Sequence, residues 1–314
     1  MHLPDGFLAP QLALALWILT ALIVGISLRR LASSRDVSAA AGRPILMGLV
    51  GAFIFAAQMF NFPVAAGTSG HLLGGVLAGY LLGPWAGTVV MTTVIGVQAL
   101  LFQDGGLLAL GANIFNMGII GTLGGTLVAR GFAISLGGGR TARIAAAGVA
   151  GWLSVMAGAG VTTLQLGLSG TTDISVGLPA MLGVHALIGI GEALITMAAL
   201  TFLATTAPDL LGAEQAASTS PLRRFLSGAS AVVVVIALAA LFASSDPDGL
   251  NSVATALGFS HVQAGAPFNL FAGYAIPGLD GTASTIVAAL IGAALIAGLL
   301  LGLSRLARSR TADK

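Results

Sequence analysis

The sequence contains no cysteine and only one lysine, Lys314. Without cysteine the chain cannot form disulfides, thiolate zinc sites or iron–sulfur clusters. A nucleotide-binding P-loop needs a lysine directly after a glycine-rich turn, and the one lysine here lies at the end of the chain. We therefore expect this chain to bind no nucleotide. If ATP powers its activity, a separate subunit must hydrolyse it.

Charged residues are also scarce, at 8% of the 314 residues, whereas 56% of the residues are hydrophobic. A soluble domain carries about a quarter charged residues. A chain this poor in charge cannot cover its surface against water, so we expect it to lie in a lipid bilayer. The 45 glycines suit helices that pack closely through small faces. Gly121 and Gly125 form one such G-x-x-x-G pair.

The apolar runs predict an all-α integral membrane protein with about nine spans. They cover residues 9–28, 45–62, 70–83, 85–102, 107–129, 143–164, 180–205, 224–243 and 283–304. A polar linker at 207–222 separates a seven-span module, residues 1–206, from a two-span hairpin module, residues 223–314. We therefore predict two membrane modules joined by a cytoplasmic linker.

The basic residues predict the orientation of these spans. All 13 Lys and Arg residues lie within residues 29–43, 130–143, 223–224 and 305–314. If nine spans alternate, these stretches all face one side, which the positive-inside rule identifies as the cytoplasm. This places the N-terminus outside and the C-terminus inside, and it explains the basic residues without a nucleic-acid partner. No basic residue precedes the first apolar run, so we expect an uncleaved span with Met1 retained.

The start of the chain offers three adjoining nitrogen donors. The Met1 amine and the His2 amide nitrogen can hold one cation in a five-membered ring, and the same amide nitrogen and the His2 imidazole close a six-membered ring. The predicted topology puts His71 on the same external side, where its imidazole could add a fourth nitrogen. Such a set suits Ni²⁺, Cu²⁺ or Co²⁺, whereas Mg²⁺ and Ca²⁺ prefer oxygen. The alternative is a frayed terminus, with His71 acting as a helix cap.

Several motifs then follow one another in a characteristic order. They are Met-His-Leu-Pro-Asp-Gly-Phe-Leu at 1–8, Asn-Phe-Pro-Val at 61–64, Gly-Thr-Ser-Gly-His-Leu-Leu-Gly-Gly at 67–75, Leu-Gly-Pro-Trp-Ala-Gly at 82–87, and further matches at 98–107, 111–118 and 185–196. Together they resemble the CbiM/NikM family, the substrate-specific components of energy-coupling factor transporters for cobalt and nickel. The resemblance covers about residues 1–205.

This resemblance implies both a metal site and partners. The implied ligands are the amine of Met1, the amide nitrogen and imidazole of His2, and the imidazole of His71. The implied fold is a seven-span bundle into which the N-terminus dips from outside. The implied cargo is Co²⁺ or Ni²⁺, and cobalt uptake would serve cobalamin biosynthesis. The implied partners are a coupling transmembrane (T) subunit and cytoplasmic ATPase (A) subunits.

The second module resembles another known element. Residues 245–250, Ser-Asp-Pro-Asp-Gly-Leu, and residues 274–278, Tyr-Ala-Ile-Pro-Gly, are similar to the PDGLE-type domain. Such hairpins occur fused to, or beside, these metal components. The usual glutamate after Leu250 is Asn251 here, and we expect that position to carry no essential chemistry.

Polar residues near the span ends could support the metal ligands. Ser69, Asn113 and Asn61 are candidates to orient His71 through hydrogen bonds. For Gln98 we favour a role in helix packing.

Three further polar residues have no assigned role. Glu192 is the one acidic residue deep in a predicted span, and His185 precedes it by seven residues on the same helix face. They form either a polar patch near the metal path or partner interface, or a neutral carboxyl group bonded to a neighbouring helix. Asp104 could attract cations, or it could form a turn with the two glycines that follow.

These observations favour a transport component over an enzyme. An intramembrane hydrolase would need a nucleophile with a base or an H-E-x-x-H pair, and Glu192 follows Gly191 rather than a histidine. The remaining alternative is an ion-driven secondary carrier or channel without an ATPase partner. That class would need an acidic relay within the membrane, for which only Glu192 is available.

Overall fold

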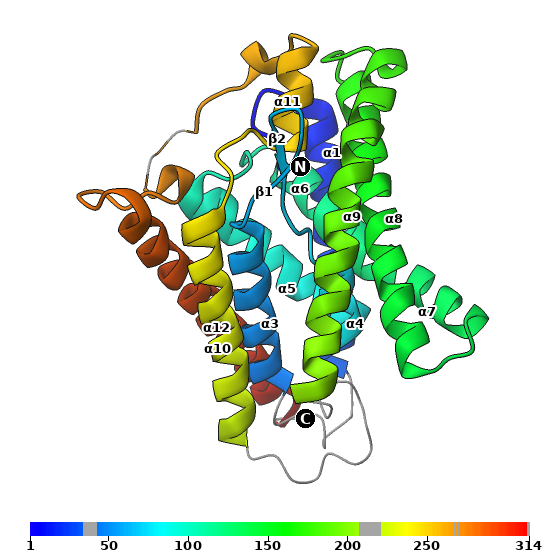
Figure 1. Cartoon of the computed structure of the whole chain (residues 1–314), viewed down its shortest axis with the longest axis vertical. Helices are drawn as coiled ribbons and strands as arrows, with labels where there is room; N and C mark the ends of the chain where they lie inside the picture. The colour runs from blue at the N-terminus through cyan, green and yellow to red at the C-terminus, as the bar shows by residue number, and fades with distance from the viewer. Residues whose placement is uncertain (34–42, 207–220, 267, 269, 313–314) are drawn as a thin grey trace.

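A computed structural model describes residues 1–33, 43–206, 221–266, 268 and 270–312, and these residues are mostly helical (Figure 1). The α-helices are α1 (Pro10–Ser33), α3 (Arg43–Gln58), α4 (Gly75–Leu82), α5 (Pro84–Val97), α6 (Leu110–Asn113), α7 (Thr126–Ser135), α8 (Arg140–Leu168), α9 (Ile174–Thr206), α10 (Pro221–Phe242), α11 (Gly249–Ala256) and α12 (Gly281–Ala312). The π-helical turns η1 (Gln98–Phe102) and η2 (Ile114–Gly125) continue α5 and α6. Strands β1 (Phe62–Ala65) and β2 (Thr68–Gly70) pair antiparallel, and η4 (Ser260–Val262) and η5 (Ala272–Tyr274) are short 3₁₀ turns.

Six helical segments in the described residues are long and apolar enough to cross a membrane. They are Pro10–Ser33, Pro84–Phe102, Leu110–Ser135, Arg140–Leu168, Ile174–Thr205 and Gly281–Leu303. Two more apolar helices, Pro44–Gln58 and Gly228–Phe242, are shorter. The prediction of a helical membrane protein is thus confirmed, while the predicted linker at 207–222 falls almost wholly outside the described residues.

The third predicted span, residues 70–83, differs from the structure. Its helix, α4, has 8 residues and begins only at Gly75. The chain before it is non-helical, and Gly74 takes a positive φ of 78° that favours glycine. Two buried side chains bind the main chain here. The Glu192 carboxylate accepts from the N–H groups of Leu73 and Gly74 at 2.5 and 3.0 Å. The Gln58 side chain donates to the Leu73 carbonyl at 2.7 Å. Partners from other helices therefore replace the missing helical hydrogen bonds.

Small residues let the helices approach closely, as the glycine content predicts. A Cβ added at Gly121 would lie 2.9 Å from the Gly75 Cα, and one at Gly75 would meet the Gly121 Cα at the same distance. Gly125, one turn further on, abuts the Val76 side chain. The G-x-x-x-G pair is therefore a helix-packing surface between η2 and α4, as predicted.

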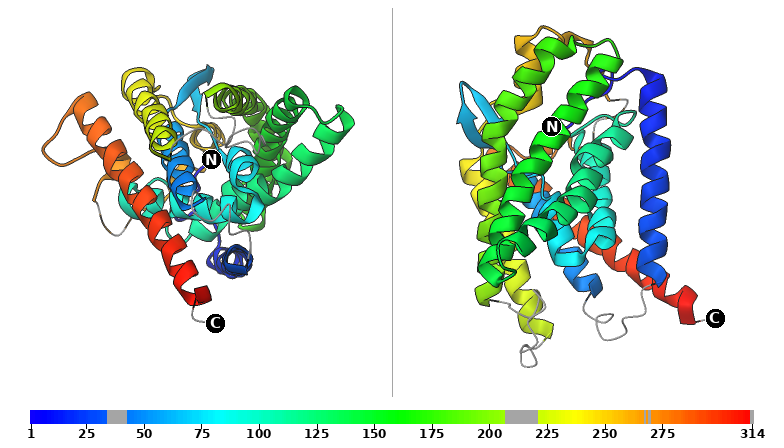
Figure 2. Two further views of the ribbon diagram at one scale, coloured as in Figure 1. Left: turned by 90° about the horizontal axis from the view of Figure 1, so that it is seen from below. Right: turned by 90° about the vertical axis from the view of Figure 1, so that its right-hand side faces the viewer.

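The C-terminal hairpin lies against the first module. Helices α10 and α12 both pack on α3, and a Cβ at Gly48 of α3 would lie 3.4 Å from the main chain of α12 at Ala297. The loop between α10 and α12 carries α11 and lies near the two strands at the upper end of the bundle (Figure 1). Viewed from below, the N-terminus lies among the helices, whereas the C-terminal end of α12 lies at the edge (Figure 2). Met1 is accordingly buried, with 4% of its surface exposed.

Candidate metal site

The first eight residues form an ordered segment inside the bundle. The Leu3 side chain is fully buried, and Asn113 of α6 holds its peptide groups with two hydrogen bonds. The Asn113 Oδ1 accepts from the Leu3 N–H at 2.8 Å, and the Asn113 Nδ2 donates to the Leu3 carbonyl at 3.0 Å. The Gly106 N–H also donates to that carbonyl, at 2.8 Å. These bonds fix the main chain directly after the first two residues.

The rest of the N-terminal motif continues this anchoring. The Asp5 carboxylate accepts from the N–H groups of Leu107 and Ala109, each at 3.0 Å. Gly6 has a φ of 91°, and any Cβ there would overlap the Val262 carbonyl, so only glycine fits. Phe7 is completely buried. Leu3, Asp5, Gly6 and Phe7 of the N-terminal motif thus each have a specific structural use.

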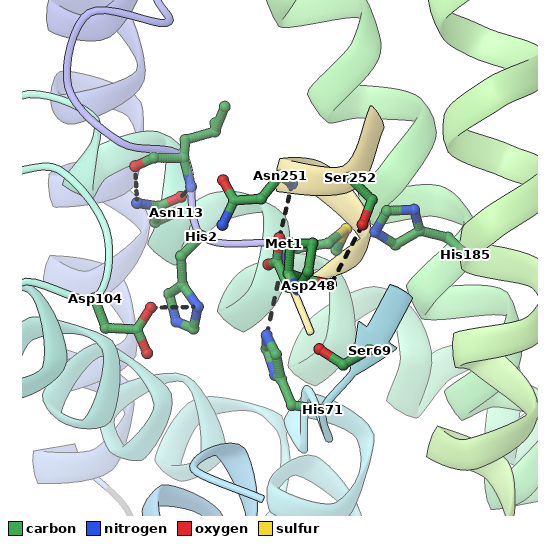
Figure 3. Close-up of polar contacts among 12 residues, drawn as sticks. Met1, His2, Ser69, His71, Asp104, Asn113, His185, Asp248, Asn251 and Ser252 are labelled. Carbon is green, nitrogen blue, oxygen red and sulfur yellow. Dashed lines mark hydrogen bonds and ion pairs between the residues drawn. The ribbon is translucent and has the colours of Figure 1, made fainter. Parts of the chain in front are cut away.

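The anchoring brings the three predicted ligand residues together (Figure 3). The Met1 amine nitrogen lies 3.4 Å from the His71 Nε2. The His2 and His71 rings stack with centroids 5.2 Å apart and planes inclined by 25°. Both rings are buried, with 7% and 5% of the residue surface exposed. His71 itself follows β2, and its Nδ1 lies 2.9 Å from the Leu72 carbonyl, which leaves Nε2 directed at the amine.

The His2 ring also contacts two polar side chains. Its Nδ1 pairs with the Asp104 carboxylate at 3.1 Å, and its Nε2 lies 3.3 Å from the Gln98 Oε1. Chelation through the His2 amide nitrogen uses Nδ1, so a metal would compete with Asp104 for this atom. Tyr274, from the C-terminal hairpin, donates to Asp104 at 2.7 Å. Gln98 thus contacts the site rather than only packing between helices, and Asp104 does more than form a turn.

A carboxylate that the sequence analysis did not assign completes the cluster. The Asp248 Oδ2 lies 2.5 Å from the Met1 amine, and its Oδ1 accepts from the Asn251 N–H at 2.8 Å. Asp248 belongs to the Pro-Asp-Gly-Leu motif at the start of α11, in the second module. The signal in the sequence was this motif itself, which resembles the PDGLE-type domain.

Burial and charge together set the protonation of these groups. Burial lowers the pKa of the His2 imidazole, and the Asp104 carboxylate only partly opposes this. Burial alone would raise the pKa of Asp248, but the nearby Met1 amine and His71, with hydrogen bonds from the amine and the Asn251 N–H, together outweigh it and hold that pKa well below its ordinary range. At neutral pH the site therefore contains a neutral His2 ring and an ionised Asp248, both able to face a cation.

The side chains predicted to orient His71 act elsewhere. Asn113 binds the Leu3 main chain, and the Ser69 hydroxyl donates to the Asp246 carbonyl at 2.7 Å. The main-chain carbonyl of Asn61 accepts from the Ser244 N–H at 2.7 Å. Because β2 pairs alongside the hairpin loop, Ser69 faces that loop instead of the His71 ring. These residues position the segments that carry the ligands, rather than the His71 imidazole.

His185 and Glu192 have separate environments on α9. Glu192 binds the main chain that follows His71, as described above. His185 lines a small cavity together with Met1, His71 and Asp248, and its ring lies on the α9 side of that cavity (Figure 3). The His185 Nε2 is buried and has no hydrogen-bond partner among the described residues. The two residues therefore do not form one patch.

The described residues contain no group of three or more His, Asp or Glu side chains that could hold a metal by themselves. A cation in this cluster would need main-chain nitrogens as well. The Met1 amine and the His2 amide are such nitrogens, beside two imidazoles. The arrangement suits a nitrogen-binding transition metal.

Known families match both modules. Residues 2–210 match CbiM, described as "Cobalt uptake substrate-specific transmembrane region", and residues 223–309 match the PDGLE domain. The chain belongs to the CbiM family and carries a fused PDGLE domain. It is therefore a membrane component of cobalt or nickel transport, as its resemblance to CbiM/NikM predicts.

Individual relatives share this organisation. A protein of Archaeoglobus fulgidus is 36% identical over 320 residues, covering 98% of this chain and all of its own length. The fused nickel transport protein NikMN of Rhodobacter capsulatus is 30% identical over 262 residues, covering 78% of this chain and 74% of its own. The cobalt transport protein CbiM of Sorangium cellulosum is 36% identical over 227 residues, covering 70% of this chain and 99% of its own.

A solved structure shares the fold of about two thirds of the chain. The crystal structure of a truncated transition metal transporter superimposes with a TM-score of 0.55 at 32% sequence identity. The match covers 65% of this chain and 98% of that chain.

Proposed function

We propose that this chain is the substrate-binding component of an ATP-driven energy-coupling factor transporter that imports Co²⁺ or Ni²⁺. It captures the cation outside the cell through the Met1 amine, the amide nitrogen and imidazole of His2, and the imidazole of His71. The observation that carries this proposal is the convergence of these groups: the amine lies 3.4 Å from the His71 Nε2, and the two rings stack. All three residues are buried, so they are not a frayed terminus.

We further propose a topology of nine crossings in the cell membrane, with the N-terminus outside and the C-terminus inside. The third crossing combines the non-helical residues 70–74 with the 8 residues of α4. At about 3.3 Å per extended residue and 1.5 Å per helical residue, these parts together span at most roughly 28 Å. This approaches the hydrocarbon thickness of about 30 Å. Non-helical chain at this depth requires buried partners, which Glu192 and Gln58 supply.

Transport requires the bound cation to be released inward. A change of conformation or orientation would open the nitrogen site to the cytoplasm, driven by ATPase subunits through a coupling transmembrane subunit. Because binding through the amine and the amide displaces protons, protonation of these groups would assist release. The alternative, an ion-driven carrier or channel, would transport metal in membranes that contain this chain alone. Copurification of an ATPase and a coupling subunit would distinguish the two.

The nitrogen site is tested by extending the purified chain by one residue ahead of Met1. The added residue removes the amine from its chelate ring while both imidazoles remain. We expect the extended protein to lose most of its Ni²⁺ and Co²⁺ content and its metal uptake. Equal metal binding by the extended and native proteins would contradict the site.

A histidine pair supplies a matched control. His71→Gln removes an imidazole from the cluster, whereas His261→Gln removes an exposed imidazole from the hairpin loop. We expect metal content to fall for His71→Gln and to stay unchanged for His261→Gln. Gel filtration in detergent establishes that each variant is folded.

A further inference from the structure

We propose that Asp248, from the external loop of the C-terminal hairpin, is itself part of the metal site, where its carboxylate faces the bound cation and balances its charge. This rests on the proposed nitrogen site and adds to it a residue from the other module. The PDGLE hairpin would then contribute directly to metal binding, rather than only accompany the metal-binding module.

The geometry supports this placement. The Asp248 Oδ2 lies 2.5 Å from the Met1 nitrogen, and this same nitrogen lies 3.4 Å from the His71 Nε2 (Figure 3). A transition metal sits roughly 2.1 Å from a nitrogen ligand. A cation bound to the amine would therefore lie at most about 4.6 Å from the carboxylate oxygen, the sum of the two distances. At this separation, in a buried site, the two charges interact strongly.

The charges of the bound state also favour a carboxylate. A divalent cation held by a deprotonated amide, two neutral imidazoles and a neutral amine leaves one positive charge in the site. Asp248 supplies one negative charge, and its side chain is only 13% exposed. Asp104 is the other carboxylate at the site, on the His2 side, and its side chain is 28% exposed. Water therefore screens Asp104 more than Asp248, so Asp248 contributes the larger share of the attraction.

Contacts from both modules hold Asp248 in position. Its Oδ1 caps α11 by accepting from the Asn251 N–H, so the side chain has a fixed direction. The preceding residue, Pro247, accepts from the Ser69 N–H at 2.9 Å, which ties the loop to β2 just ahead of His71.

The residue after Asp248 approaches two side chains of α9 closely, which glycine allows without moving them. A Cβ at Gly249 would lie 2.9 Å from the His185 Cε1 and 2.7 Å from the Ile188 Cδ1 of α9. The Pro-Asp-Gly motif thus serves three purposes: a carbonyl that binds β2, a carboxylate that faces the amine, and a close approach to α9.

The test replaces Asp248 by residues that keep the helix cap and remove the charge. Asp248→Asn and Asp248→Ser both retain an oxygen that can accept from the Asn251 N–H. The matched control is Asp246→Asn, which removes a carboxylate two residues away that accepts from the Ser244 hydroxyl instead. Calorimetric titration of the full-length protein in detergent with Ni²⁺, and separately with Co²⁺, measures the dissociation constant.

We expect both Asp248 variants to bind about tenfold more weakly or worse. Asp248→Glu keeps the charge and should bind more tightly than Asp248→Asn. The Asp246→Asn control should bind like the native protein. Native-like or tighter binding by the folded Asp248 variants would overturn the inference, and tighter binding would mean that the carboxylate competes with the metal for the amine.

The one-residue extension separates this inference from the proposed function. If the extended protein loses the metal while Asp248→Asn keeps it, the nitrogen site stands and the role of Asp248 is refuted. If the extended protein binds metal as tightly as the native one, the nitrogen site and the inference built on it both fall.

Discussion

Replacing Asn113 by leucine tests whether metal affinity depends on the anchoring of the chain start. Asn113 is fully buried and makes two hydrogen bonds to the Leu3 main chain, at 2.8 and 3.0 Å. Leucine has a similar size but no polar group. The Leu3 carbonyl keeps its bond from the Gly106 N–H, whereas the Leu3 N–H would lose the partner that the structure gives it.

The magnitude follows from these contacts. A buried N–H group without a partner costs about 1–3 kcal/mol, and the loss of one of two bonds at a carbonyl costs about 1 kcal/mol or less. A total near 2 kcal/mol weakens the docking of the N-terminal segment. If all of it opposes the docked state that binds metal, the apparent dissociation constant for Ni²⁺ rises about 30-fold.

Asn116 provides a matched control three residues further along the same helical segment. It is also buried, but its side-chain amide binds Thr162 and Gln165 of α8. Asn116→Leu should lower the thermal unfolding midpoint without a comparable change in metal affinity. Calorimetric titration of both detergent-purified variants makes the comparison. An Asn113→Leu protein that binds Ni²⁺ as tightly as the native one, or an Asn116→Leu protein that loses just as much affinity, would refute the reasoning.

Three further predictions concern the same region. Gly106→Ala should release the N-terminal segment and abolish Ni²⁺ binding, because the added Cβ would overlap the Asp5 carboxylate. The control Gly124→Ala adds a Cβ that meets no atom within 4 Å, so this variant should bind Ni²⁺ normally. Equal Ni²⁺ binding by the two variants would contradict this prediction. Glu192→Gln should weaken metal binding and thermal stability, because the two N–H groups bind different carboxylate oxygens and one of these oxygens becomes an NH₂ group that cannot accept. A native-like unfolding midpoint would contradict this. Burial lowers the pKa of His2 in the folded protein, so below about pH 6.5 the unfolded chain takes up a proton before the folded chain does. The free energy of unfolding should therefore decrease as the pH is lowered through this range. The unfolding midpoint of His2→Gln should change less between pH 7.5 and pH 5.5 than that of the native protein, and equal slopes would exclude this cause.

The topology shows where sequence patterns stop being sufficient. The predicted spans at 107–129, 143–164, 180–205 and 283–304 overlap the helical segments Leu110–Ser135, Arg140–Leu168, Ile174–Thr205 and Gly281–Leu303, since each is a long apolar run. The run at 70–83 looks similar, but its first part is not helical. Glu192, more than a hundred residues further along the chain, binds the main chain there. Hydropathy counts apolar side chains and does not register a distant carboxylate that replaces a helix's own hydrogen bonds.

The candidate site divides in the same way. The donor set predicted for Met1 and His2 is local chemistry, because adjacent atoms of two residues would form the chelate rings. Asn113, Ser69 and Gln98 were recognisable as polar residues near span ends, but their partners were not.

The sequence by itself determined the membrane environment and the family, and it predicts the metal donors, because composition and short motifs carry this information within one stretch of chain. Only the tertiary structure brought Asp248 to the Met1 amine, across 247 positions of sequence. That contact depends on how the hairpin loop lies against β2 and α9, and long-range packing of this kind leaves no periodic signal in the chain.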